Sequence, residues 1–116
     1  MLKRVALIAA LTICAMSCQR SLDSLILGEW TARRVDAVDH VTVLTHHVRY
    51  RADHTFSGVF DDPRRGLLQQ SGTWRIEGNR IISKDEHGES RAEIVRLTRN
   101  ELEFRPPDGV IARYTR

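Results

Sequence analysis

Apolar and polar residues alternate along most of the chain after residue 27. Between Thr55 and Phe60, for example, Phe56 and Phe60 share one face with Gly58, while Thr55 and Ser57 take the other. Side chains of a β-strand point to opposite faces in turn, so this period of two predicts half-buried strands. The pattern recurs between short turns and predicts strands at residues 28–38, 41–51, 55–60, 71–77, 80–84, 92–97, 101–105 and 110–116.

The predicted strands are joined by local turns. Gly78-Asn79 is a two-residue hairpin signal, and Pro106–Gly109 is the strongest turn in the chain. Short strands at a spacing of roughly 8–12 residues are typical of an antiparallel sandwich or barrel. A meander of eight strands avoids exposed edges by closing on itself, so we expect an all-β, eight-stranded antiparallel barrel. Residues 25–27 would enter it as a single helical turn.

The same alternation predicts which side chains meet inside the barrel. Those expected on the interior, where they would line any ligand cavity, are Leu44, His46, Val48, Tyr50, Phe56, Phe60, Trp74, Ile76, Leu102, Phe104 and Tyr114. An eight-stranded barrel either holds one small ligand or is filled by its own side chains. Both alternatives remain open, because large aromatic side chains could fill so short a barrel.

The N-terminal residues have the organisation of a secretory signal. Lys3 and Arg4 form a basic start, residues 5–13 are almost entirely apolar, and small residues precede Cys18. The apolar run is shorter than the roughly 17–25 residues that cross a bilayer. The segment Ala15–Cys18 resembles the bacterial lipobox, in which the cysteine is lipidated and the peptide is cut just before it.

This resemblance predicts a signal peptide over residues 1–17, a lipid-anchored linker over residues 18–26 and a barrel domain over residues 27–116. Stable anchoring takes at least two acyl chains, and a lipobox cysteine carries several. Gln19 after Cys18 implies, by resemblance to enterobacterial sorting, the outer membrane, with the barrel facing the periplasm. The alternatives are a retained anchor helix and an ordinary secretory signal with incidental cysteines.

Composition changes this picture in two respects. Cleavage would leave 116 − 17 = 99 residues, one small domain, and would reduce the 18 basic residues to 16, against 15 acidic. Such a balance, with charges interspersed, does not favour nucleic acid as a partner. Both cysteines, Cys14 and Cys18, precede the domain, so no disulfide is expected in it.

Five motifs, in order, resemble the small bacterial lipocalin-like domain family. They are residues 27–30 (LGEW), 50–56 (YRADHTF), 71–79 (SGTWRIEGN), 94–102 (IVRLTRNEL) and 114–116 (YTR). One departure is His54, where the family usually has glycine in the turn. The resemblance implies a calycin-like barrel in the cell envelope and says little about activity, since most members have none established.

In lipocalins the first strand carries a Gly-x-Trp whose indole lies across the closed end of the barrel, under a late arginine. Carried onto this sequence, the resemblance implies barrel-closing roles for Gly28 and Trp30, with Arg113 or Arg116 over the indole. Such a guanidinium–indole contact is worth about 0.5–2 kcal/mol. We therefore expect these residues to be structural.

Catalytic and metal-binding patterns are weak. His46 and His47 would point to opposite faces of one strand, and the chain has no Cys-x-x-Cys or His-Glu-x-x-His motif. No activated nucleophile or phosphate-binding glycine loop stands out. We expect neither an enzyme nor a metal or other cofactor.

The leading hypothesis is a lipid-anchored, non-enzymatic envelope protein whose lipocalin-like barrel binds a small hydrophobic or amphipathic ligand. The alternative is an envelope protein–protein interaction or inhibitor-type module, with a filled barrel and no small ligand. Exposed arginines would then form its binding surface, with Arg33, Arg49, Arg51, Arg64 and Arg65 as candidates.

Overall fold

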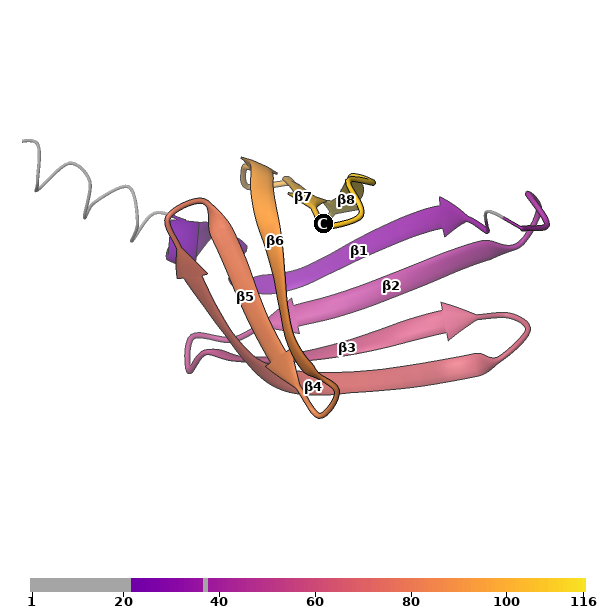
Figure 1. Ribbon diagram of the computed structural model, residues 1–116, viewed down its shortest axis with the longest axis horizontal. Coiled ribbons are helices and arrows are strands. Elements are labelled where there is room, and N and C mark those ends of the chain that lie inside the picture. Colours follow the sequence, from indigo (N-terminus) through magenta and orange to yellow (C-terminus); the bar gives the residue numbers. More distant parts are fainter. Residues whose placement is uncertain (1–21, 37) are drawn as a thin grey trace, which may run out of the picture.

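The structure is a computed structural model that describes residues 22–36 and 38–116. Eight antiparallel strands follow one another in chain order and close into a barrel (Figure 1). They are β1 (Gly28–Val35), β2 (Val43–Tyr50), β3 (Thr55–Asp62), β4 (Gly66–Glu77), β5 (Arg80–Asp85), β6 (Gly88–Leu97), β7 (Glu101–Arg105) and β8 (Ala112–Thr115). The expected all-β antiparallel barrel is confirmed. The predicted signal peptide and lipobox lie outside the described residues.

Two strands begin earlier than the alternation predicts. β4 begins at Gly66 rather than at residue 71, and β6 begins at Gly88 rather than at residue 92. Residues 67–70 read Leu-Leu-Gln-Gln, which has no period of two, yet they pair in continuous register with β3. Residues 67–70 therefore form a strand because they pair with β3, not because their own sequence alternates. β1 and β8 are shorter than predicted.

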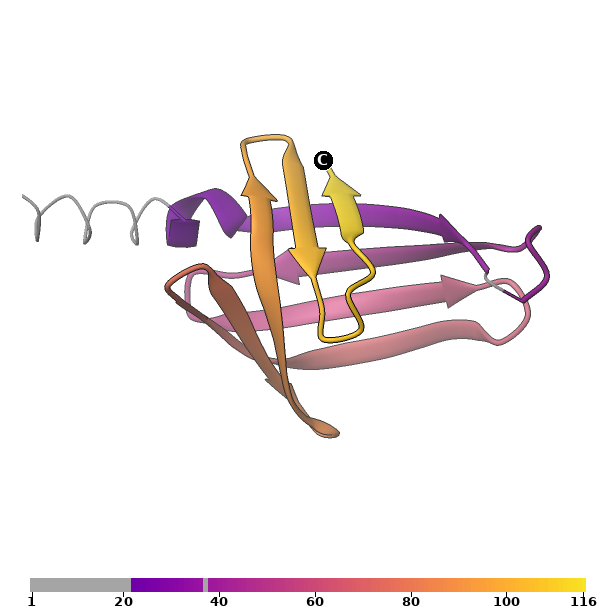
Figure 2. The same cartoon turned by 45° about the horizontal axis from the view of Figure 1, so that its top comes forward.

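The barrel consists of a long sheet crossed by a shorter one. β1–β4 run side by side, and β5–β8 cross over them (Figures 1 and 2). β4 serves both parts, since residues 66–73 pair with β3 and residues 73–77 pair with β5. The two pairings overlap at Thr73, next to Gly72, where a Cβ would lie 1.9 Å from the carbonyl oxygen of Lys84. Such an approach of two backbones requires glycine.

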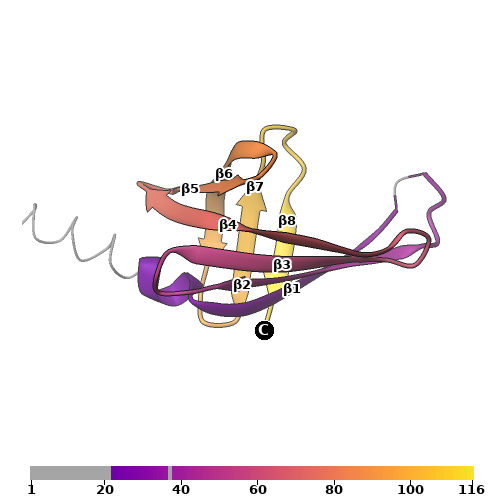
Figure 3. The same ribbon diagram turned by 90° about the horizontal axis from the view of Figure 1, so that it is seen from below.

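Beyond the crossing, the distal parts of β1–β4 extend as an open four-stranded sheet (Figures 2 and 3). β1 is paired in register with β8 at one position only, Thr31 with Thr115. The barrel therefore has a closed end, next to the helix of residues 22–26, and an open end, where β5–β8 do not cover the inner face of the long sheet.

The closed end is filled by one continuous cluster of buried side chains. Its members are Ile26, Trp30, Val48, Tyr50, Phe56, Trp74, Ile76, Ile81, Ile94, Leu102 and Phe104. Fully burying a large apolar side chain contributes about 1.5–3 kcal/mol, so this cluster supplies the main stabilisation of a domain without a disulfide.

A plug formed by Trp30 seals the closed end. The indole is fully buried, and its Nε1 donates a hydrogen bond to the carbonyl oxygen of Ile26 at 2.8 Å. The guanidinium of Arg116 lies 3.9 Å from the centre of the indole ring. Arg113 instead pairs at the surface with Glu103, at 3.5 Å. The arginine over the indole is therefore Arg116.

Gly28 allows this arginine to approach. Its φ of +112° is a conformation that other residues rarely adopt, and a Cβ there would lie 3.1 Å from a guanidinium nitrogen of Arg116.

Candidate functional site at the open end of the barrel

A group of polar side chains lies on the inner face where the long sheet leaves the barrel. β2 contributes His46, which is opposite Ala32 of β1 and Phe60 of β3 in the register. Two residues before Phe60 in β3, Gly58 is opposite Gln70 of β4. These positions share the inner face because side chains alternate along each strand. We call this group, with Arg34 of β1 and Tyr114 of β8, the mouth site.

His46 connects the long sheet to the last strand of the barrel. Its Nδ1 is hydrogen-bonded to the hydroxyl of Tyr114 at 2.7 Å, across 68 positions of sequence. The imidazole also contacts two aromatic rings, with centroid distances of 5.4 Å to Phe60 and 5.6 Å to Tyr114. The ring is thereby held in one orientation.

The second imidazole nitrogen faces a confined space above Gly58. Nε2 of His46 is buried and faces the side-chain amide of Gln70. A Cβ at Gly58 would meet this Nε2 at 3.1 Å and Oε1 of Gln70 at 3.6 Å. When the Tyr114 hydroxyl donates to Nδ1, Nε2 carries the proton and is directed at Oε1 of Gln70.

Burial sets the protonation of the two central side chains. It lowers the pKa of His46, and the nearby Arg34 and His47 lower it further, while Gln70 partly offsets the shift. Burial raises the pKa of Tyr114 to about 12. Both groups are therefore neutral near pH 7, and the positive charge of the mouth site belongs to Arg34.

Arg34 gives the mouth site its positive charge. Its guanidinium carbon lies 5.8 Å from the centre of the Phe60 ring, and the side chain is exposed. Leu68, opposite Phe60 in the register and 46% exposed, adds apolar surface on the same face, and Leu44, opposite Arg34, is buried. A cation beside an apolar wall suits an amphipathic molecule with an anionic group.

The structure divides the sequence-predicted lining residues between two places. Those at or beside the mouth site are Leu44, His46, Phe60 and Tyr114. Those packed into the core cluster are Val48, Tyr50, Phe56, Trp74, Ile76, Leu102 and Phe104. Side chains of the second group fill the closed half of the barrel.

Sequence reasoning did not identify Arg34 and Gln70 as site residues. Arg34 could have been found, because it continues the alternation of Trp30 and Ala32 along β1. Gln70 could not, because residues 67–70 have no alternation and their place in β4 depends on pairing with β3.

The remaining histidines lie apart from the mouth site. His47 is exposed, and its Nδ1 is hydrogen-bonded to Thr31 at 3.0 Å. His54 packs on Trp74 at the other end of β3, and His40 lies in the turn before β2. Within residues 22–36 and 38–116, no three His, Cys, Asp or Glu side chains are grouped as they would be to hold a metal ion.

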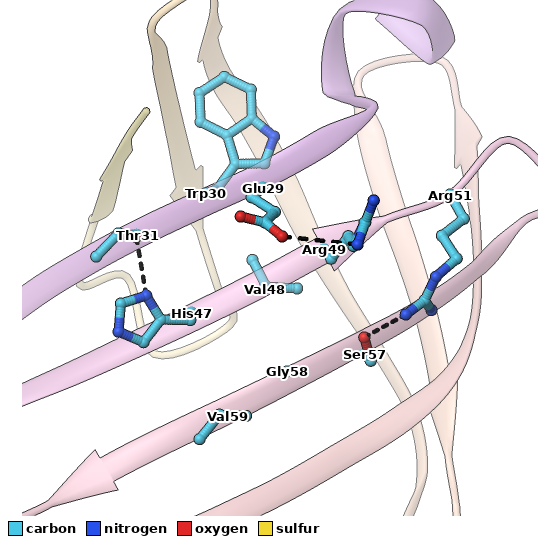
Figure 4. Close-up of a pocket in the computed structure, with 10 residues that line it drawn as sticks. All are labelled: Glu29, Trp30, Thr31, His47, Val48, Arg49, Arg51, Ser57, Gly58 and Val59. Atoms are coloured by element: carbon cyan, nitrogen blue, oxygen red, sulfur yellow. Dashed lines mark hydrogen bonds and ion pairs between the residues drawn. The ribbon is translucent and has the colours of Figure 1, made fainter.

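Three depressions lie along the outer wall of the barrel. The first, of about 320 Å³, crosses β1–β3 and contains the ion pair of Glu29 with Arg49 and the hydrogen bond from Arg51 to Ser57 (Figure 4). Two others, of about 500 and 420 Å³, lie beside the β5–β6 and β7–β8 turns. They are open to solvent and lined by charged and polar side chains together with apolar surface, unlike the concave, mostly apolar sites that small ligands prefer.

The helix of residues 22–26 is short, and none of the described helical segments is long and apolar enough to cross a membrane.

Comparison with known proteins identifies the relatives of this fold. The family described as the lipocalin-like domain matches residues 26–104. No curated protein matches the chain. A Bacteroides uniformis protein solved by NMR superposes with a TM-score of 0.61 at 20% identity, covering 81% of this chain and 90% of that one.

A second solved structure is the Cpx pathway activator NlpE from Escherichia coli. It superposes with a TM-score of 0.50 at 15% identity, covering 69% of this chain and 42% of that one. At these identities the two superpositions establish the shared fold alone.

Proposed function

Because the chain belongs to the lipocalin-like domain family, we propose that it is a non-enzymatic binding protein of the bacterial cell envelope. We propose that its mouth site takes a small amphipathic ligand with an anionic group. The observation that carries this proposal is Arg34, an exposed cation beside Phe60 on the inner face and next to His46.

The proposed ligand would lie across the open inner face rather than deep in the barrel. Its anionic group would pair with Arg34 beside the imidazole of His46, and its apolar part would lie along Phe60 and Leu68. The closed half leaves the ligand little room, because the core cluster fills it. We therefore expect a short apolar part rather than a long chain buried along the barrel axis.

The test uses dansylglycine, whose apolar part is short, and its uncharged methyl ester as probes for the full-length protein. We expect saturable binding of the acid and weaker binding of the ester. Arg34→Gln should weaken binding of the acid by about tenfold, the typical value of one charge-assisted contact. Arg33→Gln is the matched control, because Arg33 is adjacent but on the outer face. Equal losses for the two variants, or no saturable binding, would overturn the proposal.

The second candidate is an envelope interaction or inhibitor-type module with no small ligand. The filled closed half of the barrel favours it. The candidate arginines are mostly engaged at the surface: Arg49 with Glu29, Arg51 with Ser57, and Arg64 and Arg65 with Asp62. Absence of probe binding, together with one stoichiometric envelope partner, would favour this function.

We propose that Cys18 anchors the protein through lipid, as the lipobox resemblance implies. Cys18→Ser should release the protein from the membrane fraction. Cys14→Ser should leave its distribution unchanged and is the matched control. Retention of the Cys18→Ser protein in membranes would refute lipid anchoring without touching the proposal for the mouth site.

A further inference from the structure

The first half of β4 has an unpaired edge. Residues 66–73 pair with β3 on one side, but β5 pairs only with residues 73–77 on the other. Residues 66–71 therefore present a strand edge beside the open sheet (Figure 2). Such an edge is a template for another strand.

The direction of the backbone groups along this edge follows from the register. The amide of Trp74 donates to the carbonyl oxygen of His54, so residue 74 points its backbone groups toward β3. Backbone direction alternates along a regular antiparallel strand. Leu67 and Gln69 therefore point their N–H and C=O groups toward the free edge, and Leu68 points its own toward β3.

The edge lacks the devices that usually prevent pairing. Proteins protect edge strands with charge, proline or a bulge. Residues 66–71 contain no charged residue and no proline, and their register with β3 is continuous. Leu67 is 68% exposed on the outer face, and Leu68 is 46% exposed on the inner face. The edge is therefore apolar and open at Leu67 and Leu68, and the charged β5–β6 turn (Asp85–His87) lies beside its other end, at Gln69–Ser71.

We propose that this edge pairs with the same edge of a second copy of the chain, antiparallel about a twofold axis at Leu68. Leu68 then faces the Leu68 of the second copy in a non-hydrogen-bonded pair, where Cα atoms are about 4.5 Å apart. Leu67 of each copy pairs with Gln69 of the other through two backbone hydrogen bonds. The four strands β1–β4 of both copies form one continuous sheet, with both mouth sites on the same side.

A second copy fits better than other occupants because the edge is neutral. Self-pairing places identical residues near one another, which destabilises charged strands but not this one. The opposite edge of the open sheet, in β1, carries Arg33 and Arg34, so pairing of β1 with β4 would bring two unpaired charges to the seam. The twofold arrangement also closes on itself, whereas pairing of β1 with β4 would continue into a fibre.

The interface is small. A pair of short strands buries less than the roughly 1,200–2,000 Å² of a standard interface, so we expect a reversible dimer. Sedimentation velocity of the full-length chain in mild detergent should show a monomer–dimer equilibrium. Species larger than the dimer would overturn the twofold arrangement.

Cysteine cross-linking tests the register directly. In the proposed dimer, Leu68→Cys places two Cα atoms about 4.5 Å apart, within the range of a disulfide. Leu67→Cys is the matched control, because its copies would be offset by two residues and lie roughly 8 Å apart, beyond that range. Leu67 is the more exposed of the two, so random collision would favour cross-linking there.

Under mild oxidant, Leu68→Cys should therefore form the disulfide dimer several-fold faster than Leu67→Cys. The unsubstituted chain gives the background from Cys14 and Cys18. Equal rates, or a faster reaction of Leu67→Cys, would overturn the proposed register.

Proline tests the hydrogen bonds. Gln69→Pro removes an amide that points to the free edge, so the β3–β4 ladder stays intact while each copy loses a donor to the other. Gln69→Ala removes the same side chain and keeps the amide. We expect Gln69→Pro to weaken dimerisation by about tenfold or more relative to Gln69→Ala, with both variants folded by circular dichroism. Equal dimerisation of the two folded variants would overturn the proposal.

Discussion

Arg116 covers the indole of Trp30 at 3.9 Å and at the same time donates hydrogen bonds to the carbonyl oxygens of Leu25 and Leu27 at 2.8 and 2.6 Å. The last residue of the chain thus connects the N-terminal segment to the closed end of the barrel. A planar guanidinium can stack and donate in several directions together, which an ammonium cannot.

Arg116→Ala should lower the free energy of unfolding by about 2–3 kcal/mol, through the lost stacking and the carbonyl oxygens left without donors. Arg116→Lys should recover only part of the loss. Arg113→Ala is the control, because its exposed pair with Glu103 is worth less than about 1 kcal/mol. Denaturant unfolding followed by tryptophan fluorescence measures all three. Equal effects at positions 113 and 116 would contradict the structural role of Arg116.

Gly72→Ala should be among the most destabilising single-methyl additions in the chain. Its Cβ would lie 1.9 Å from the Lys84 carbonyl oxygen, so β4 and β5 would have to move apart. We expect a loss of about 2–4 kcal/mol, as for overpacked sites with little freedom to relax. Ser71→Ala, at the neighbouring exposed position, should cost less than about 0.5 kcal/mol. Thermal denaturation of the two variants checks this, and a stable Gly72→Ala protein would be inconsistent with the bend at Gly72.

His54 occupies a left-handed backbone conformation, with a φ of 65°. A residue with a Cβ, such as histidine, is less stable in this conformation than glycine by about 1–2 kcal/mol. The imidazole offsets part of the cost, because it packs on Trp74 at 4.7 Å and its Nδ1 is hydrogen-bonded to the Trp74 carbonyl oxygen at 3.2 Å.

His54→Gly should consequently change stability little, since relief of strain balances the lost contact. His54→Val should be destabilising by about 2 kcal/mol, because a β-branched residue tolerates this conformation poorly. The melting temperatures of the two variants test this prediction. A His54→Val protein as stable as the His54→Gly protein would show that the turn has another backbone conformation in solution.

His46 should make folding stability depend on pH. Burial lowers its pKa below the ordinary value of 6.5, so the unfolded chain binds the proton more readily. The free energy of unfolding is therefore unaffected by His46 above about pH 6.5, and it decreases as the pH falls below that value, because the unfolded chain takes up the proton first. His46→Phe removes the titration and should flatten the dependence between about pH 5 and 7. An unchanged slope in urea unfolding would show that another group is responsible.

The extent to which sequence predicts this fold depends on the strand. β3 and β7 were predicted nearly to their ends. In β3, Phe56 and Phe60 share a face with Gly58 between them, and in β7, Leu102 and Phe104 are two positions apart. The first half of β4 was not, because Leu67 and Leu68 face opposite sides of a sheet that is exposed on both. Without one buried face, no alternation is required.

The mouth site was predictable only in part for a similar reason. His46 and Tyr114 followed from alternation along single strands, but their hydrogen bond joins β2 to β8 and depends on closure of the barrel. Alternation does distinguish Arg116 from Arg113, because residue 116 shares the face of Ala112 and Tyr114 whereas residue 113 takes the opposite face. The choice of Arg116 as the arginine above Trp30 could therefore have been made from the sequence.

The pairing of β1 with β8 has a consequence for synthesis. Every other neighbouring pair of strands is consecutive in the chain, so each can form as soon as its second strand emerges during translation. The seam at Thr31 and Thr115 spans 115 − 31 = 84 positions and waits for β8. In a nascent chain the sheet therefore stays unclosed, and Trp30 lacks the Arg116 that covers it, until β8 has left the ribosome.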